Sequence, residues 1–128
     1  MSYNAMGNDY TNQFDTQDVA DNKVISVLAY IPLLFWLPLV TGTKSRFGRF
    51  HANQGLILLL LCLVFGVASA IIGLIFGWIP IVGAIISGLV NIVLWVSELA
   101  LMIYGMVNTG NGRAKQLPFV GGLITLIQ

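Results

Sequence analysis

The residue types best suited to recognition chemistry lie close together, in the stretch RFGRFHANQG at residues 46–55. Arginines bind phosphate groups, and a histidine followed by two amide side chains offers donors and acceptors to a ligand. Two interpretations stay open: a polar recognition site at the mouth of a helix, or a basic anchor that binds lipid headgroups. The candidate residues are Arg46, Arg49, His51, Asn53 and Gln54.

A second candidate site is centred on Glu98, the only Asp, Glu, Lys or Arg in residues 52–112. Asn91 lies seven residues before it and Ser87 four residues before that, so the three share one face of a helix. Polar groups within a membrane are costly and usually face a helix bundle or a partner. Glu98 is therefore expected either to hold helices together through hydrogen bonds or to bind a proton or cation in a translocation pathway.

Enzymatic chemistry is not expected. The sequence lacks the phosphate-binding G-x-x-x-x-G-K-[ST] motif and the H-E-x-x-H, C-x-x-C and G-x-S-x-G motifs. His51 has no second histidine or thiolate nearby to complete a metal site, and Cys62 is the only cysteine. We therefore predict no catalytic residue, no cofactor and no metal.

The amino-acid composition of this chain is typical of a protein that lies in a lipid bilayer. Of its 128 residues, 57% are hydrophobic and 9% are charged, against about 25% charged in a typical soluble domain. So few charges would not cover a water-soluble fold of this size. The expected partner is the lipid bilayer, and no nucleic-acid partner is expected.

Three hydrophobic segments follow one another. Residues 52–76 and 84–108 are uninterrupted, and at about 1.5 Å per residue each would measure about 37 Å, enough to cross a hydrocarbon core of about 30 Å. Residues 24–40 contain Pro32 and Pro38, which break a helix. We predict an all-α integral membrane bundle, with a two-helix hairpin and a proline-broken first segment that crosses or re-enters.

Shorter segments complete this organisation. Residues 1–22 are polar and without apolar periodicity, so they are expected to form a disordered tail before a membrane domain at 23–128. The stretch GWIPIVG at residues 77–83 predicts a tight turn. Residues 117–128 are apolar but too short to cross, and are expected to lie along the interface or fold back onto the bundle.

Orientation follows from the basic residues. The loop at 41–51 and the tail after residue 108 hold five of the six Lys and Arg residues, and two crossings separate them. By the positive-inside rule both lie in the cytoplasm of a multi-pass cell-membrane protein, with residues 77–83 outside. A crossing by residues 24–40 is favoured, which places the N-terminus outside; a re-entrant segment would instead leave it in the cytoplasm.

Small residues recur at the spacing of a helix face in the second segment. Ser69, Gly73 and Gly77 are separated by four residues each. Such residues let membrane helices approach closely. Three helices enclose little volume, so a homo-oligomer or a larger membrane partner is expected.

Four stretches carry a family resemblance: NKVISVLAYIPLL (22–34), SRFGRFHANQGLIL (45–58), FGWIPIVG (76–83) and GNGRAKQLPFVGG (110–122). The chain resembles small bacterial membrane proteins grouped under a domain of unknown function. These are distantly similar to the twenty-kilodalton component of the protein translocon of the inner chloroplast envelope. The resemblance implies an all-helical membrane protein with a role in, or ancestry shared with, polypeptide translocation.

The expected function is that of an accessory or assembly subunit of a membrane, with a link to translocation. The alternative is a homo-oligomeric channel or transporter that uses Glu98 as its intramembrane site. Copurification distinguishes them, since a stable larger partner supports the first and a lone, conducting oligomer supports the second.

Overall fold

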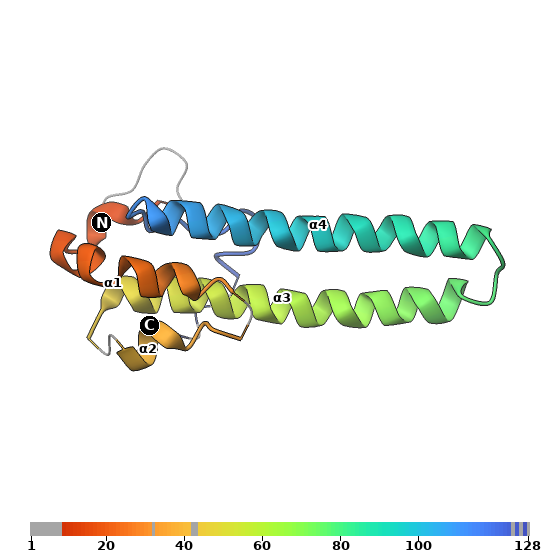
Figure 1. Ribbon diagram of the computed structural model, residues 1–128, viewed down its shortest axis with the longest axis horizontal. Helices are drawn as coiled ribbons and strands as arrows, with labels where there is room; N and C mark the ends of the chain where they lie inside the picture. The colour runs from red at the N-terminus through yellow and green to blue at the C-terminus, as the bar shows by residue number, and fades with distance from the viewer. Residues whose placement is uncertain (1–8, 32, 42–43, 124, 126, 128) are drawn as a thin grey trace.

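Two long antiparallel helices dominate the molecule. The computed structural model describes residues 9–31, 33–41, 44–123, 125 and 127. Helices α3 (Arg46–Phe76) and α4 (Val82–Gly110) lie side by side along its whole length (Figure 1). The described residues form no β-strand, so the all-α class predicted from the sequence is confirmed.

Three short helices gather at the end where α3 begins and α4 ends (Figure 1). They are the 3-10 helix η1 (Thr11–Gln13), α1 (Thr16–Leu28) and α2 (Leu37–Thr41). Helix α1 contacts both long helices, whereas α2 contacts α3 and α1. One end of the hairpin is therefore surrounded by further structure.

Helix α3 begins six residues before the predicted segment. Ser45 is the N-cap residue, and its hydroxyl oxygen accepts a hydrogen bond of 2.9 Å from the Gly48 amide. Serine favours this position because its side chain satisfies an amide that the first helical turn leaves unpaired. The polar stretch 46–55 therefore forms the first turns of the helix, and the apolar run follows from Leu56.

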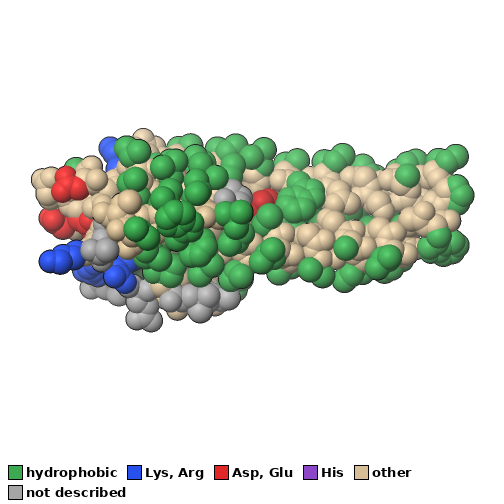
Figure 2. Space-filling model, turned by 60° about the horizontal axis from the view of Figure 1, so that its bottom comes forward, with side chains coloured by type: hydrophobic (Ala, Val, Ile, Leu, Met, Phe, Trp, Pro, Cys, Tyr) green, Lys and Arg blue, Asp and Glu red, His purple; other side chains and the backbone are tan. Residues whose placement is uncertain are grey.

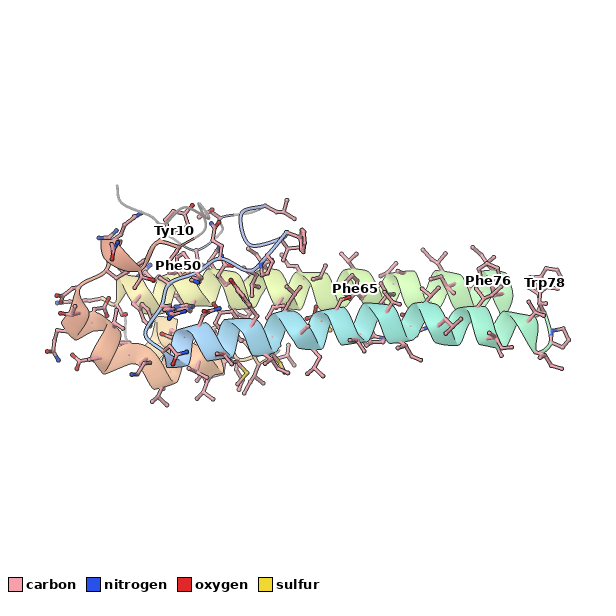
Figure 3. All side chains as sticks on the ribbon, turned by 90° about the horizontal axis from the view of Figure 1, so that it is seen from above. Tyr10, Phe50, Phe65, Phe76 and Trp78 are labelled. Carbon is pink, nitrogen blue, oxygen red and sulfur yellow. The ribbon has the colours of Figure 1, made fainter. Side chains whose placement is uncertain are left out.

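The predicted tight turn at residues 77–83 joins α3 to α4. A Cβ atom at Gly83 would lie 1.9 Å from the Phe76 carbonyl oxygen, so only glycine allows the chain to fold back this closely. Trp78 stands at the tip, 76% exposed (Figure 3). Such exposure suits an aromatic side chain at a membrane interface.

Helix α4 ends at Gly110, two residues beyond the predicted segment 84–108. Gly112 has φ +75°, and its amide donates to the Thr109 carbonyl at 2.9 Å. The Arg113 amide donates to the Asn108 carbonyl, also at 2.9 Å. This pair of bonds forms a Schellman motif, in which glycine takes the left-handed conformation that stops the helix.

The proline-containing segment at residues 24–40 turns back instead of following the hairpin along its length. Helix α1 ends at Leu28, and α2 returns along α3 with Pro38 in its first turn, where a missing amide costs little. The turn touches α3 at Gly55, where an added Cβ would lie 2.0 Å from the Ala29 carbonyl oxygen. In the described residues this segment is therefore divided between α1 and α2, at the end of the hairpin where α3 begins.

The N-terminal residues differ from expectation. Residues 9–22 include η1 and the start of α1, where a disordered tail was predicted; residues 1–8 lie outside the described part of the chain. They lie at the same end of the hairpin as Ser45 and Ala114, not at the end of residues 77–83. Asp18 holds them at this end, because its carboxylate accepts a hydrogen bond from the Phe47 amide in the first turn of α3.

Two regions can thus be named. The head comprises the described residues up to Gly55 together with residues 105–123, and the distal hairpin comprises residues 65–96. Lys, Arg and most acidic side chains gather at the head end, whereas hydrophobic side chains cover the hairpin (Figure 2). Of the most apolar 18-residue windows of α3 and α4, 17% and 6% are buried within the molecule. Both helices are long and apolar enough to span a bilayer.

Candidate functional site at the head of the hairpin

His51 lies at the centre of the head and is fully buried. Its Nδ1 atom lies 2.6 Å from the Tyr30 hydroxyl and 3.1 Å from the Thr109 hydroxyl. Its Nε2 atom lies 3.0 Å from the Arg113 carbonyl oxygen, which only accepts, so Nε2 carries the proton. The ring therefore connects three distant parts of the chain, at Tyr30, Thr109 and Arg113.

Aromatic rings surround this histidine. The ring centroids of Phe47, Phe50 and Tyr30 lie 4.5, 5.1 and 5.5 Å from that of His51, all in edge-on arrangements. Tyr10 packs against Phe50 from the N-terminal side (Figure 3). Phe47 is fully buried in protein, with the Phe14 ring edge-on to it at a centroid distance of 6.0 Å.

Gln54 and Asn53 bind the chain's own C-terminal segment. The Gln54 Oε1 atom accepts from the Leu117 amide at 2.8 Å, and Nε2 donates to the Gly121 carbonyl at 2.9 Å. The Asn53 Oδ1 atom accepts from the Ile127 amide at 3.1 Å. The predicted recognition site is thus occupied by backbone from this molecule, and residues 117–123 fold back onto α3, as one of the two expectations had it.

Asp18 holds α1 to the start of α3, a contact that the sequence did not reveal. Its carboxylate accepts from the Ser45 hydroxyl at 2.5 Å, the Phe47 amide at 3.0 Å and the Asn22 side chain at 2.9 Å. Partial burial raises the pKa of this carboxyl, but the hydrogen bonds outweigh burial and lower the pKa below its ordinary value. The partial positive charge at the N-terminal end of α3 also stabilises a carboxylate at this position.

Thr11 ties the N-terminus to the other end of the chain. Its hydroxyl accepts from the Ala114 amide at 3.0 Å, and the neighbouring Tyr10 amide donates to the Ala114 carbonyl at 2.8 Å. The Asp9 carboxylate accepts hydrogen bonds from both the amide and the hydroxyl of Thr11. The backbones of Asp9 and Lys115 pair in an isolated antiparallel β-bridge. Burial raises the pKa of Asp9, but these hydrogen bonds and the charges of Lys115 and Arg113 lower it overall.

The basic residues share one end of the molecule (Figure 2). Arg46 is exposed, and its guanidinium lies 5.7 Å from the centre of the Phe14 ring, a cation–π distance. Lys44 is exposed and Arg49 is half-buried. The segments around Lys44 and Arg113 are thus brought together, as an anchor at one membrane surface requires.

The polar stripe of α4 faces α3. The Ser69 hydroxyl donates to the Asn91 Oδ1 atom at 2.6 Å, and the Asn91 side-chain Nδ2 donates to the Ser87 backbone carbonyl at 2.8 Å. Glu98 is 8% exposed, and its Oε2 atom lacks a hydrogen-bond partner among the described residues. Seven residues, or about 10 Å, separate Glu98 from Asn91, so the two side chains form separate sites. Within the described ranges, His, Cys, Asp and Glu form no group of three or more that could hold a metal ion.

The predicted packing residues fall on different faces. Ser69 faces α4, whereas a Cβ atom at Gly73 or Gly66 would meet nothing within 4 Å. At Gly77 a Cβ atom would lie 2.3 Å from the Gly73 carbonyl oxygen, so this glycine serves the end of α3. Gly66 and Gly73 are therefore left open on the outer surface of the hairpin.

Comparisons with known proteins agree on a membrane protein. The model of the magnetosome magnetite crystal formation protein family matches residues 21–124. A membrane protein of the uncharacterised family UPF0132 from Methanocaldococcus jannaschii is 33% identical over 107 residues, which cover 80% of this chain and 67% of that protein. No solved structure matches the chain. The predicted small membrane protein of an uncharacterised family is confirmed; neither match is a translocon component.

Proposed function

Because the chain belongs to the magnetosome magnetite crystal formation protein family, we propose that it acts as an assembly subunit of the cell membrane. In this proposal the outer faces of the hairpin bind other membrane helices, in a second copy or in a larger partner. For the process named by the family, such a subunit would organise the membrane at which a crystal forms. The observation that carries the proposal is the open space above Gly66 and Gly73.

These two glycines lie on one exposed face of α3. Ala70, four residues after Gly66 and three before Gly73, is also exposed, so the three small residues form a continuous surface. Helices in lipid associate through close packing of such surfaces, because burying apolar side chains gives no advantage over contact with acyl chains. Within the molecule, α4 packs on another face of α3, through Ser69. The small surface is therefore available to a further helix.

We further propose that the head lies in the cytoplasm. Lys44, Arg46, Arg113 and Lys115 belong to the head, and the opposite tip at residues 77–83 carries no charged residue. The positive-inside rule favours this orientation. The described N-terminal residues would then share the cytoplasmic side.

The assembly proposal is tested by filling the open surface. The double variant Gly66→Leu, Gly73→Leu should convert an oligomer of the parent protein to monomer in mild detergent, measured by sedimentation equilibrium. Val67→Leu, an exposed position beside the small surface, is the matched control and should leave the oligomer intact. A parent protein that is monomeric alone and copurifies with nothing from its native membrane would contradict the proposal.

A second candidate function rests on Glu98. Its unpartnered, buried carboxyl oxygen within a membrane helix is also what a proton or cation site would present. Reconstituted liposomes should then conduct, and Glu98→Gln should abolish the flux without changing the oligomer. Copurification of a protein-translocation component without crosslinker would instead support the translocation-related form of the assembly role.

A further inference from the structure

We propose that the head inserts two apolar turns into one leaflet of the bilayer, so that the protein favours membranes curved with the head on the convex face. The first insertion turn comprises residues 33–36, and the second comprises residues 117–123. Of the described residues, the opposite leaflet would hold α3, α4 and the turn that joins them. The protein would therefore occupy more area in the leaflet of the head than in the other.

The depth of the head follows from helix length. A hydrocarbon core of about 30 Å corresponds to about 20 helical residues. Counted from the residue 77–83 turn, this length reaches about Ile57 on α3 and about Leu101 on α4. Leu101 packs against the buried cluster of Tyr30, Leu58 and Leu117, so the two counts end at the same level. The apolar core of the head thus lies at the edge of the hydrocarbon.

The second insertion turn extends past this edge. Phe119 shares a surface hollow of about 360 Å³ with Ser97, Ala100 and Leu101 of α4. Leu123 lines another hollow, of about 160 Å³, formed only by apolar side chains: Ile57, Leu60, Leu61, Val64 and Val120. Phe119 is 99% exposed and Leu123 is 71% exposed. Their surface continues the membrane surface of α3 and α4, so acyl chains are the occupant that covers them.

The first insertion turn lies at the same level on the other side of α3 (Figure 1). It begins three residues after Tyr30, and Phe35 approaches Gly55, where an added Cβ atom would lie 3.1 Å from the Phe35 Cβ. Leu33 is 67% exposed and Trp36 is 44% exposed. Tryptophan at the boundary between headgroups and hydrocarbon is typical of membrane proteins.

Backbone strain supports the same interpretation. Leu33 has φ +73° and Phe119 has φ +69°, in the left-handed region that bulky residues avoid. Glycine would adopt either conformation without strain. At both turns a large apolar side chain is instead held outward at its most exposed point. A hydrocarbon environment, in which these side chains are favourably buried, accounts for both positions.

The experiment uses membrane tubes pulled from giant vesicles that contain the full chain. A cysteine at Thr16 in the head, labelled with a membrane-impermeant dye after reconstitution, reports only molecules whose head faces outward. A cysteine at Val82 near the opposite tip reports only molecules of the reverse orientation. We expect head-outward molecules to be enriched severalfold on the tube relative to the vesicle, and the reverse molecules to be depleted. Equal densities on tube and vesicle for both orientations would overturn the proposal.

Variants assign the effect to the insertion turns. Leu33→Ser, Phe119→Ser and Leu123→Ser together should bring the enrichment of head-outward molecules close to one. Ile81→Ser is the matched control, because Ile81 is also an exposed apolar residue with positive φ (+63°), but at the opposite tip. It should leave the enrichment unchanged. An enrichment that survives the triple substitution would contradict the role of the turns.

The proposal stands apart from the assembly function. The Gly66→Leu, Gly73→Leu variant should still be enriched on tubes as a monomer, because its insertion turns are intact. Loss of oligomers with retained enrichment would leave the inference standing. Retained oligomers without enrichment would reject it while leaving the assembly function in place.

Discussion

The head and the distal hairpin belong to the same two helices but are held together differently. In the head, polar side chains bind backbone far away in the sequence: His51 binds Arg113, Gln54 binds Leu117, and Asp18 binds Phe47. In the distal hairpin, α3 and α4 meet through the Ser69–Asn91 hydrogen bond and the Phe65–Trp95 ring contact at 6.3 Å. The head thus has its own packed core, whereas the distal hairpin presents most of its surface to lipid.

This difference shows how the fold divides its stabilising interactions. Buried hydrogen bonds to backbone fix the head in one arrangement, because leaving any of these groups unpaired costs free energy. In the distal hairpin the hydrophobic effect does not drive the two helices together, because lipid tails are as apolar as the side chains. Its remaining contacts are therefore made with lipid and with partner helices. Substitutions in the head should therefore affect folding, and substitutions in the distal hairpin should affect assembly.

The largest contrast is expected between two glycines of α3. Gly55→Ala in the head places a Cβ atom 2.0 Å from the Ala29 carbonyl oxygen, so the turn before α2 must move, and we expect a loss of about 3 kcal/mol or more. Gly73→Ala in the distal hairpin meets open space and should be neutral or stabilising by up to about 1 kcal/mol. Denaturation of both variants in the same detergent, followed by circular dichroism, compares them. Equal losses would show that the two regions do not differ in packing.

A smaller effect is expected from His51→Phe. Phenylalanine resembles imidazole in shape but leaves the Tyr30 hydroxyl and the Arg113 carbonyl without their partner, which should cost about 2 kcal/mol. The distal counterpart is Ser69→Ala, which removes one hydrogen bond between membrane helices and should cost about 0.6 kcal/mol. Unfolding midpoints in detergent measure both. A His51→Phe protein as stable as the parent would mean that the buried network contributes nothing.

Asp18→Ala should weaken the junction of α1 and α3 by about 1 kcal/mol, because it removes an acceptor from the first turn of α3. Asp15→Ala is the control: Asp15 precedes α1, is exposed and makes no capping bond through its side chain. Hydrogen exchange at the Phe47 amide gives a local readout. Faster exchange in the Asp15 variant than in the Asp18 variant would reject the assigned role.

The smallest effect concerns acid. Because hydrogen bonds hold the pKa of Asp18 and Asp9 below the ordinary value near 3.8, their contribution to stability is fully present above that value and is lost as the pH falls through the lowered pKa. The temperature at the unfolding midpoint of the parent protein should therefore decrease once the pH is lowered below about 4. Asp18→Asn should show a shallower decline over the same pH range. An identical decline in the two proteins would contradict this assignment.

Sequence patterns predicted the distal hairpin well. Uninterrupted apolar runs predicted its helices, and residues 77–83 predicted its turn. These features depend on residues close in the sequence, where periodicity and turn chemistry operate. The polar interface of Ser69 and Asn91 also lies along one predicted helix face.

The head was less predictable, because its contacts join distant residues. Asp18 and Phe47 are 29 residues apart, and His51 and Arg113 are 62 apart. Tyr30 and Thr109 carried no periodic signal, and the aspartates of residues 9–21 resembled those of a solvated tail. Ser45 was the one local indication, since a serine before a helical stretch is a common N-cap. An acceptor for the Ser45 hydroxyl proton could have been sought among the aspartates earlier in the chain.

The most direct test of this account is the sidedness of three engineered cysteines in a Cys62→Ser background. Thr16→Cys and Gln116→Cys lie in the head, and Val82→Cys lies near the opposite tip. A membrane-impermeant thiol reagent applied to sealed right-side-out and inverted vesicles should label both head cysteines from the cytoplasmic side and Val82→Cys from the other side. Labelling of Thr16→Cys and Gln116→Cys from opposite sides, or of all three from one side, would contradict a hairpin that crosses the membrane with its head on a single face.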